Sequence, residues 1–270
     1  MIAKVHYNFR KSPFVKQFRC IFEAMIFRDR AIIRLESVDS TNNYAANLLK
    51  LTSPPDGTVI TAQEQTQGKG QRGAEWKATY GQNLLSSIIV YPNFIPSERT
   101  FLLSQVTALA VREVVEHFTQ RDTYIKWPND IICQNKKIAG ILIEFNWMDG
   151  CAQSAIIGVG INVNQHFFDY PSAASLLNLT GKHISIEEIL SSYIDQLDLR
   201  YRQLFNKQYD VIHSAYNSQL WKKGVLSDFV YSQEKIQAEI IEAQEDGKLN
   251  LSSPSKGTII CDLKEISMIF

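Results

Sequence analysis

A glycine-rich loop constrains what this chain can fold into more than any other stretch. Residues 65–73 read Gln-Thr-Gln-Gly-Lys-Gly-Gln-Arg-Gly, and Trp76 follows shortly after. Three glycines within six residues leave the backbone free to reach positive φ and to approach a ligand closely. Successive free N–H groups can ring an anion, and Lys69 and Arg72 add two positive charges. The indole of Trp76 can stack on a flat ring, so the stretch predicts a phosphate-and-base loop.

The known phosphate-binding loops do not fit this stretch, which lies between strand-like runs at Thr58–Ala62 and Leu84–Tyr91. A dinucleotide-binding Gly-x-Gly-x-x-Gly must open a helix, and residues 74–82 show no helical apolar stripe. In a P-loop Ser or Thr follows the Gly-Lys pair, whereas Gly70 does so here. The kinase loop has Val two residues after its last glycine, where this chain has Glu75. A flexible surface turn remains the alternative to a different kind of anion-binding loop.

Four further motifs narrow the choice because of their order along the chain. They are Ser40-Thr41-Asn42, Lys126-Trp127-Pro128-Asn129-Asp130, Lys137-Ile138-Ala139-Gly140 and Gly158-Val159-Gly160-Ile161-Asn162-Val163-Asn164. Together with the glycine loop, these motifs resemble those of biotin protein ligases in order and in spacing. The resemblance covers about residues 31–205, and a weaker resemblance continues from there to the C-terminus. Five motifs in the same order are far more specific than any one of them.

The resemblance implies a two-step reaction. The carboxylate of biotin attacks the α-phosphate of ATP with Mg²⁺ present, pyrophosphate leaves, and the acyl group of biotinyl-5′-AMP then passes to a lysine of a carrier protein. Two anions meet in the first step, so cations and oriented N–H donors are needed around them. The implied partner is the biotin carboxyl carrier protein of acetyl-CoA carboxylase or of a related carboxylase. We also expect a cytoplasmic monomer or homodimer that binds neither a specific DNA nor a membrane.

The resemblance also implies roles for individual residues. The catalytic cations are Lys137, Lys69 and Arg72, the substrate-binding residues are Ser40, Thr41, Asn42, Gln65, Gly70, Gln71, Gly140 and Leu142, the nucleotide-binding residues are Trp76, Asn129 and Asn162, and the candidate metal ligand is Asp130. The family more often has Arg at the positions of Lys69 and Gln71. Lys69 keeps the charge without the planar fork of Arg, and Gln71 lacks the charge, so we expect Arg72 to take over part of its role.

Five of these residues also have a purely structural interpretation. Ser40 or Thr41 can simply cap a helix, and Lys137 can be a solvated charge in a turn. Asp130 can be an exposed turn carboxylate, and Asn162 can satisfy backbone groups at the end of a strand. The sequence leaves both interpretations open for each of them.

The pattern of apolar residues predicts an α+β fold with a mainly antiparallel sheet. The predicted elements are a strand at Ala31–Glu36, a helix after Ser37–Asn42, a helix at Glu98–Phe118, a strand at Tyr124–Lys126, a hairpin of Ile131–Cys133 and Ile138–Phe145 across Gln134–Lys137, a strand at Ala155–Val163, a loop-rich stretch at Pro171–Lys182 and a helix at Ile186–Phe205. Five short runs after Lys222 predict a small barrel. The resemblance adds that the sheet is class II synthetase-like and the barrel SH3-like, with a leader at 1–30, a catalytic domain at 31–221 and the barrel at 222–270.

Composition excludes several other classes of protein. The formal net charge is zero, so no global field attracts nucleic acid, although residues 1–30 carry seven Lys or Arg against two acids. None of the four cysteines forms a Cys-x-x-Cys pair, which argues against a structural metal and favours a reducing cytosol. No run reaches the 18 or more apolar residues of a membrane span. We expect the leader to contribute neither a signal peptide nor a winged helix, with Met25 as a candidate start.

Two other functions remain open from the sequence. A lipoate ligase or a related acyltransferase would share the catalytic fold, although the charged glycine loop and the C-terminal barrel favour biotin. A non-catalytic transcriptional corepressor is the second alternative, against which the lack of a predicted winged helix argues.

Overall fold

The computed structural model describes residues 31–269, so the predicted leader and the candidate start at Met25 lie outside the described residues. The strands are β1 (Ile32–Val38), β2 (Val59–Gln65), β3 (Asn83–Val90), β4 (Thr123–Lys126), β5 (Asp130–Cys133), β6 (Lys136–Met148), β7 (Cys151–Asn162), β8 (Ser227–Tyr231), β9 (Glu234–Ala243), β10 (Leu249–Ser253), β11 (Gly257–Cys261) and β12 (Ile266–Met268). The helices are α2 (Thr41–Leu51), α3 (Phe101–Thr119), α4 (Leu176–Thr180), α5 (Ile186–Phe205) and α6 (Tyr209–Ser218).

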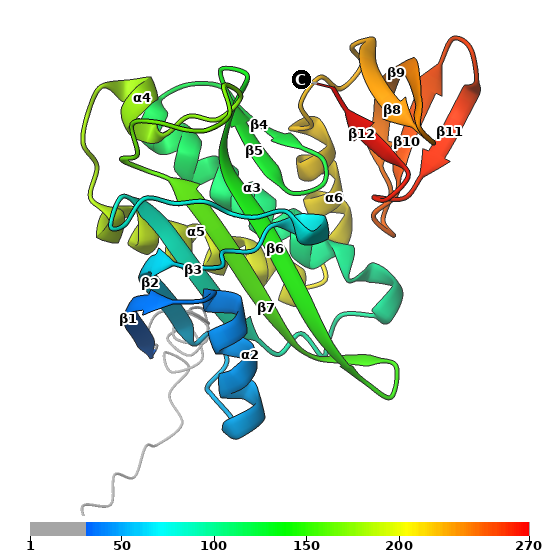
Figure 1. Ribbon diagram of the computed structural model, residues 1–270. Coiled ribbons are helices and arrows are strands. Elements are labelled where there is room, and N and C mark those ends of the chain that lie inside the picture. The colour runs from blue at the N-terminus through cyan, green and yellow to red at the C-terminus, as the bar shows by residue number, and fades with distance from the viewer. Residues whose placement is uncertain (1–30, 270) are drawn as a thin grey trace, which may run out of the picture.

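The described strands form two sheets (Figure 1). The larger has seven strands in the order β1-β2-β3-β7-β6-β5-β4, and the smaller has five in the order β11-β10-β9-β8-β12. Within the larger sheet β1 and β2 are parallel, whereas the other neighbouring pairs are antiparallel. The smaller sheet is antiparallel throughout. The predicted α+β class is therefore confirmed.

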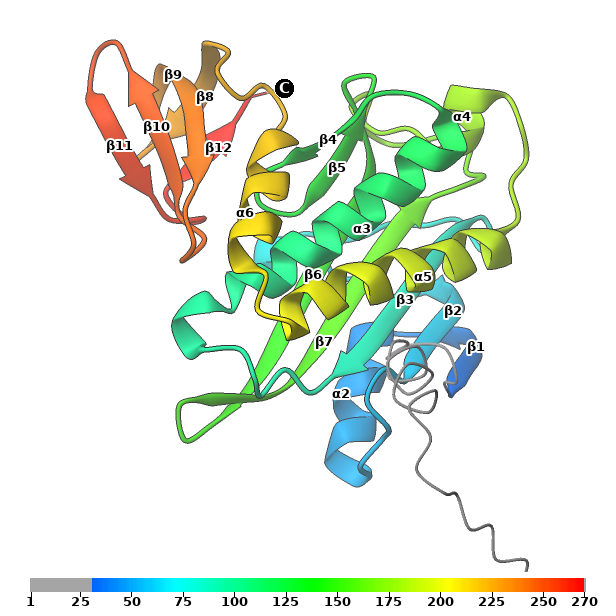
Figure 2. The same cartoon turned by 180° about the vertical axis from the view of Figure 1, so that it is seen from behind.

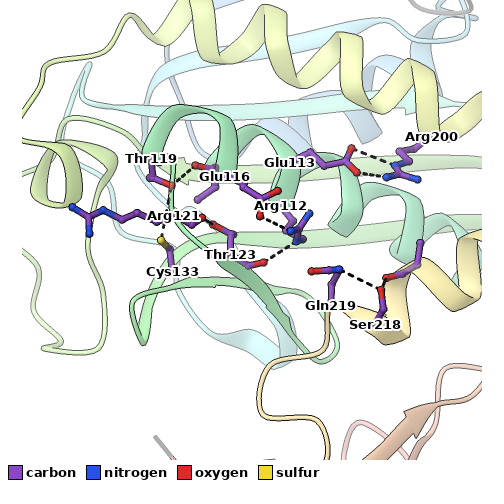
Figure 3. A network of polar contacts seen from close by, with 12 residues as sticks. Arg112, Glu113, Glu116, Thr119, Arg121, Thr123, Cys133, Arg200, Ser218 and Gln219 are labelled. Carbon is purple, nitrogen blue, oxygen red and sulfur yellow. Dashed lines mark hydrogen bonds and ion pairs between the residues drawn. The ribbon is translucent and has the colours of Figure 1, made fainter.

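Helices cover both faces of the larger sheet. Figure 2 shows α3 and α5 crossing one face, while α2 lies against the other, where Ala45 packs on Ile60, Ile89 and Ile156. Polar contacts also tie α3 to its neighbours: Arg200 on α5 pairs with Glu113, as Figure 3 shows. No helix within residues 31–269 is long and apolar enough to cross a membrane.

Two helices were not predicted. Helix α4 lies inside the stretch that the sequence predicted as loop-rich, and it begins with a capping box at Ser175. Helix α6 buries only Ile212, Tyr216 and Asn217 along ten residues, which is too weak an apolar pattern to predict a helix. Its place is set by tertiary contacts, among them the hydrogen bond of Tyr216 Oη to the carbonyl of Pro128 at 3.0 Å.

The β5–β6 hairpin is tighter than predicted. Its turn consists of Gln134 and Asn135 alone, which have φ of 49° and 57°. Positive φ at both central residues is the signature of a two-residue type I′ turn, whose twist matches that of the flanking strands. Lys136 and Lys137, predicted in the turn, therefore belong to β6.

The smaller sheet docks on the larger unit through the turn between β9 and β10. The carbonyl of Gly247 in this turn accepts a hydrogen bond from Trp127 Nε1 at 3.1 Å. Asn217 on α6 bonds both backbone groups of Ala243, at 3.0 Å and 2.8 Å. The C-terminal sheet thereby supports the Trp127-Pro128-Asn129-Asp130 segment, one of the five motifs.

Replacing Gly247 with alanine should lower the free energy of unfolding by about 1–3 kcal/mol, the usual cost of a strained backbone residue. Gly247 has φ of +92°, and an added Cβ would lie 3.0 Å from the ring of Phe101. Gly257→Ala is the matched control, because its φ is +71° but an added Cβ meets nothing within 4 Å. Thermal unfolding should show the larger loss for Gly247→Ala, and equal losses would mean that the contact with Phe101 is unimportant.

Candidate active site

A small cavity lies where the glycine loop crosses over β6 and β7. Its volume is about 50 Å³, room for a water molecule or two, whereas sites for drug-sized ligands measure about 300–1,000 Å³. Most predicted site residues line it: Ser40, Thr41, Asn42, Gln65, Lys69, Gly70, Gln71, Trp76, Asn129, Asp130, Lys137, Gly140 and Leu142. Arg72 and Asn162 do not. The cavity in this conformation is therefore too small for a ligand of that size.

One end of the cavity is a polar cluster at the start of α2. The backbone N–H and the hydroxyl of Thr41 both donate to Gln65 Oε1, at 2.8 Å and 3.0 Å. Ser87 on β3 places its hydroxyl 2.7 Å from that of Thr41. Ser40 is the N-cap residue, yet its side chain makes no capping hydrogen bond. The cluster therefore faces the cavity with hydroxyl and amide groups that do more than cap a helix.

Asn42 is held in this cluster from three sides. Its Oδ1 accepts a hydrogen bond from Ser87 at 2.6 Å, and its Nδ2 donates to Glu144 Oε2 at 2.7 Å. A Cβ at Gly158 on β7 would lie only 2.3 Å from Asn42 Oδ1. Only glycine at 158 leaves room for Asn42 in this position. Ser87, Glu144 and Gly158 were not predicted as site residues from the sequence, although Gly158 opens one of the five motifs.

Glycines also form the floor of the cavity. Gly140 on β6 pairs directly with Gly160 on β7, and the indole of Trp76 lies over both. A Cβ would approach the indole to 2.9 Å at Gly140 and to 2.5 Å at Gly160. Trp76 Nε1 is buried there without a hydrogen-bond partner. The indole thus lies in a space that exists only because Gly140 and Gly160 have no side chains.

The other end of the cavity holds an ion pair. Lys137 Nζ lies 2.6 Å from Asp130 Oδ1, and the two side chains are 34% and 18% exposed. The backbone of Lys137 is fixed by hydrogen bonds from its N–H to Ser172 O and from the N–H of Ala174 to its carbonyl, at 2.7 Å and 3.1 Å. Lys137 is therefore a half-buried strand residue aimed at the cavity, which excludes the solvated turn charge that the sequence left open.

Lys69 lies at the rim of the cavity and is held from the side of α2. Its Nζ lies 2.5 Å from Asn43 Oδ1, and Asn43 Nδ2 lies 2.5 Å from Asp39 Oδ2. The hydrogen bond from Asn43 lowers the pKa of the Asp39 carboxyl below its ordinary value, and the charge of Lys69 adds to this effect. The lysine is thus tethered beside an anion rather than extended into the cavity.

The glycine loop itself differs from the prediction. Of its three glycines only Gly73 has positive φ, and Arg72 shares that conformation with φ of 58°. A Cβ at Gly68 would lie 2.3 Å from the carbonyl oxygen of Trp76, so this glycine permits a close approach inside the loop. The N–H of Gly70 donates to Ala74 O at 2.6 Å. The expected ring of free N–H groups is therefore wrong at Gly70, because the loop folds back on itself.

Two predicted site residues lie elsewhere. Arg72 borders a neighbouring cavity of about 270 Å³ between the loop, Lys126 and apolar residues of the C-terminal sheet. Asn162 is buried, and its Nδ2 donates to Ala174 O at 3.1 Å. This bond serves backbone groups at the strand end, the structural alternative for Asn162. Asn129 keeps its place beside the cavity, and its Nδ2 donates to Ile141 O at 2.7 Å.

Asp130 is the one predicted metal ligand. Among residues 31–269 no three His, Cys, Asp or Glu side chains are grouped as a metal site. Mg²⁺ bound with a nucleotide usually takes one or two carboxylates and completes its shell with phosphates and water. A single carboxylate at this place fits that mode and does not fit a metal held by protein groups alone.

The structure thus has a mixed sheet whose cavity has a glycine floor, a polar cluster at one end and an ion pair at the other. The model of the biotin/lipoate A/B protein ligase family matches residues 35–162. The chain is 32% identical over 188 residues to the bifunctional ligase/repressor BirA of Bacillus spizizenii, covering 68% of this chain and 58% of that protein. It is 32% identical over 180 residues to the biotin–[acetyl-CoA-carboxylase] ligase of Mycobacterium tuberculosis, covering 64% of this chain and 66% of that protein.

The fold is also similar to that of a solved biotin protein ligase structure. The biotin protein ligase of Aquifex aeolicus, in complex with biotin and ATP, aligns with a TM-score of 0.74 and 26% identity over 88% of this chain and 98% of that one. The chain belongs to the biotin/lipoate A/B protein ligase family, and within the family it resembles biotin protein ligases.

Proposed function

We propose that the protein is an ATP-dependent biotin protein ligase. It activates biotin as biotinyl-5′-AMP with release of pyrophosphate and then transfers biotin to a lysine of a biotin carboxyl carrier protein. The observation that carries the proposal is the cavity, which joins Thr41 and Asn42 to the Lys137–Asp130 pair across a glycine floor. Ser87 holds Thr41 and Asn42 in place from behind. The likeness to the Aquifex aeolicus ligase, a complex with biotin and ATP, supports the choice of substrates.

The polar cluster suits the ureido ring of biotin. A ureido group presents one carbonyl acceptor and two N–H donors in a plane, so it needs donors and acceptors close together. Thr41 supplies a hydroxyl that can donate or accept, and Asn42 adds an amide already oriented by Ser87 and Glu144. Buried groups arranged for such a ring discriminate strongly against an acid that lacks it, because they would be left unpaired.

The glycine floor suits the bicyclic ring and the nucleotide. Gly140 and Gly160 leave a space that the indole of Trp76 now fills. When the loop opens, biotin occupies this space and Trp76 covers the ligand, where the indole can stack on the adenine. The buried Nε1 of Trp76 then gains access to an acceptor on the ligand.

The ion pair suits the reacting centre. The carboxylate of biotin, with its ring in the polar cluster, extends toward Lys137, and the α-phosphate must meet it there. Lys137 offsets the repulsion between these two anions, while Lys69 and Arg72 add positive charge when the loop closes. Asp130 orients Lys137 and is the carboxylate available to the Mg²⁺ that accompanies ATP.

The remaining assignments belong to the same proposal. Residues 31–221 form the catalytic domain and residues 222–270 the SH3-like domain. The partner is the carrier protein of acetyl-CoA carboxylase or a related carboxylase, and the enzyme acts in the cytoplasm as a monomer or homodimer. The free thiols of Cys133, Cys151 and Cys261 agree with a reducing compartment.

Biotin-dependent exchange of labelled pyrophosphate into ATP tests the proposal. The purified protein should catalyse this exchange with biotin and Mg²⁺, since adenylate formation is reversible, and it should not do so with lipoate. Exchange driven by lipoate in place of biotin would identify a lipoate ligase instead. Tight biotin binding without any exchange would point to a non-catalytic binding protein.

A further inference from the structure

Four polar side chains form a continuous chain of hydrogen bonds from the polar end of the cavity to β6. Thr41 Oγ1 lies 2.7 Å from Ser87 Oγ, which lies 2.6 Å from Asn42 Oδ1. Asn42 Nδ2 in turn lies 2.7 Å from Glu144 Oε2. These four residues are together called the polar chain. Thr41 and Asn42 line the cavity, whereas Ser87 and Glu144 do not.

Glu144 reaches Asn42 because of its place on β6. Successive side chains of a strand point to opposite faces, so Gly140, Leu142 and Glu144 share one face. Gly140 and Leu142 line the cavity. Glu144 is the next residue along that face, is exposed, and borders a separate cavity of about 240 Å³. Its carboxylate therefore contacts the buried amide of Asn42 from outside the cavity.

Two groups that can only accept hydrogen bonds fix the orientation of the Asn42 amide. An ionised carboxylate and a backbone carbonyl have no hydrogen to donate. Nδ2 of Asn42 donates to Glu144 Oε2 and, at 3.4 Å, to Leu142 O. Turning the amide over would place its oxygen against both of these acceptors. Both hydrogens of Nδ2 are therefore used, and Oδ1 has to face Ser87.

The oriented amide sets the direction of the other hydrogen bonds. Asn42 Oδ1 can only accept, so the single hydroxyl hydrogen of Ser87 has to point at it. The Ser87 hydroxyl then accepts from Thr41, whose own hydrogen is shared between Ser87 Oγ and Gln65 Oε1. Hydrogen bonds that all run in one direction polarise one another. Thr41 and Asn42 can then offer a ligand only lone pairs of oxygen.

We propose that Glu144 is a positioning residue that makes the polar end of the cavity an acceptor of hydrogen bonds, so that this end selects N–H groups of the substrate. The inference rests on the proposed function, and it assigns the ureido N–H groups of biotin to Thr41 and Asn42. An acid that presents an oxygen at this place would bring two acceptors together with no hydrogen between them. Buried groups left unpaired in this way discriminate strongly against such a ligand.

Glu144→Ala and Glu144→Gln test the proposal in the full chain. Alanine leaves only the 3.4 Å contact with Leu142 O to orient the Asn42 amide, so the Kd for biotin should rise about tenfold. Glutamine keeps an acceptor for Asn42 Nδ2, so the Kd should stay within about threefold of its original value. Asn146→Ala is the matched control, since Asn146 is the next residue on the same face of β6, is exposed and borders the same separate cavity. Isothermal titration measures each Kd.

A second kind of ligand separates positioning from a merely structural role. In two analogues of biotin, one or the other ureido N–H is replaced by an oxygen atom, which turns a donor into an acceptor. The unmodified protein should bind at least one of them far more weakly than biotin. The ratio of that Kd to the Kd for biotin should fall about tenfold in Glu144→Ala, because the Asn42 amide can then turn and donate to the oxygen. Glu144→Gln should retain the ratio.

Two outcomes would overturn the inference. An unchanged Kd for biotin with an unchanged ratio in Glu144→Ala would mean that the carboxylate does not set the direction of the polar chain. A weaker affinity for every ligand with the ratio retained would mean that Glu144 only supports the fold, and thermal unfolding would register the loss of stability. Failure of the proposed function is distinguishable, because the unmodified protein would then lack biotin-dependent pyrophosphate exchange.

Discussion

Lys137→Ala should slow the formation of biotinyl-5′-AMP by roughly 10²–10³-fold, equivalent to about 3–4 kcal/mol, by analogy with the loss of one preorganised donor. The carboxylate and the α-phosphate repel each other as they approach, and negative charge on the phosphoryl oxygens grows toward the transition state. The ammonium therefore helps the transition state more than it helps ground-state binding, which is the condition for catalysis. Single-turnover rates with saturating biotin and ATP measure the effect.

Lys136→Ala is the matched control, one residue away on the same strand. Lys136 Nζ donates to the carbonyl of Pro171 and lies outside the lining of the cavity, so its loss should change the rate of adenylation only slightly. Transfer from preformed biotinyl-5′-AMP should suffer less than adenylation in Lys137→Ala, because the α-phosphate then leaves with its charge already present. Thermal unfolding separates these effects from instability caused by leaving Asp130 without its partner. A sensitive Lys136 with a silent Lys137 would contradict the proposed arrangement.

Gly158→Ala should weaken biotin binding by roughly 30–150-fold, about 2–3 kcal/mol, the cost of disrupting hydrogen bonds of a buried polar group. The new Cβ would lie 2.3 Å from Asn42 Oδ1, so Asn42 has to leave its place. Its bonds to Ser87 and Glu144 are then lost. Isothermal titration with biotin measures the change.

The effect of Gly158→Ala has its own controls. Gly150→Ala lies in the β6–β7 turn, where an added Cβ meets nothing within 4 Å, and biotin affinity should stay unchanged. In Asn42→Ala the asparagine side chain is absent, so adding Gly158→Ala to it should cost little more. Fully additive losses in the double variant would show that Gly158 acts independently of Asn42.

Local patterns of apolar residues were sufficient to predict the longer helices. Helix α5 runs over the predicted range Ile186–Phe205, because twenty residues with one apolar stripe leave little choice of conformation. Helix α3 begins at Phe101, three residues after the predicted start at Glu98, since a 3₁₀ turn at Ser97–Arg99 precedes it. Helix α6 was missed because its burial depends on partners distant in sequence. The parallel pairing of β1 with β2 was equally invisible, since a single strand does not encode its neighbour.

The sequence by itself determined the fold class, the family resemblance and most of the residues that line the cavity, because periodicity, glycines and ordered motifs are local properties. Only the tertiary structure decided that Asn42 rests on Gly158, that Trp76 lies on Gly140 and Gly160, and that Lys137 pairs with Asp130. These contacts depend on the registers of the β3–β7 and β6–β7 ladders and of the β5–β6 hairpin. A shift of one residue in such a ladder turns every side chain to the opposite face, and no local pattern specifies the register between distant strands.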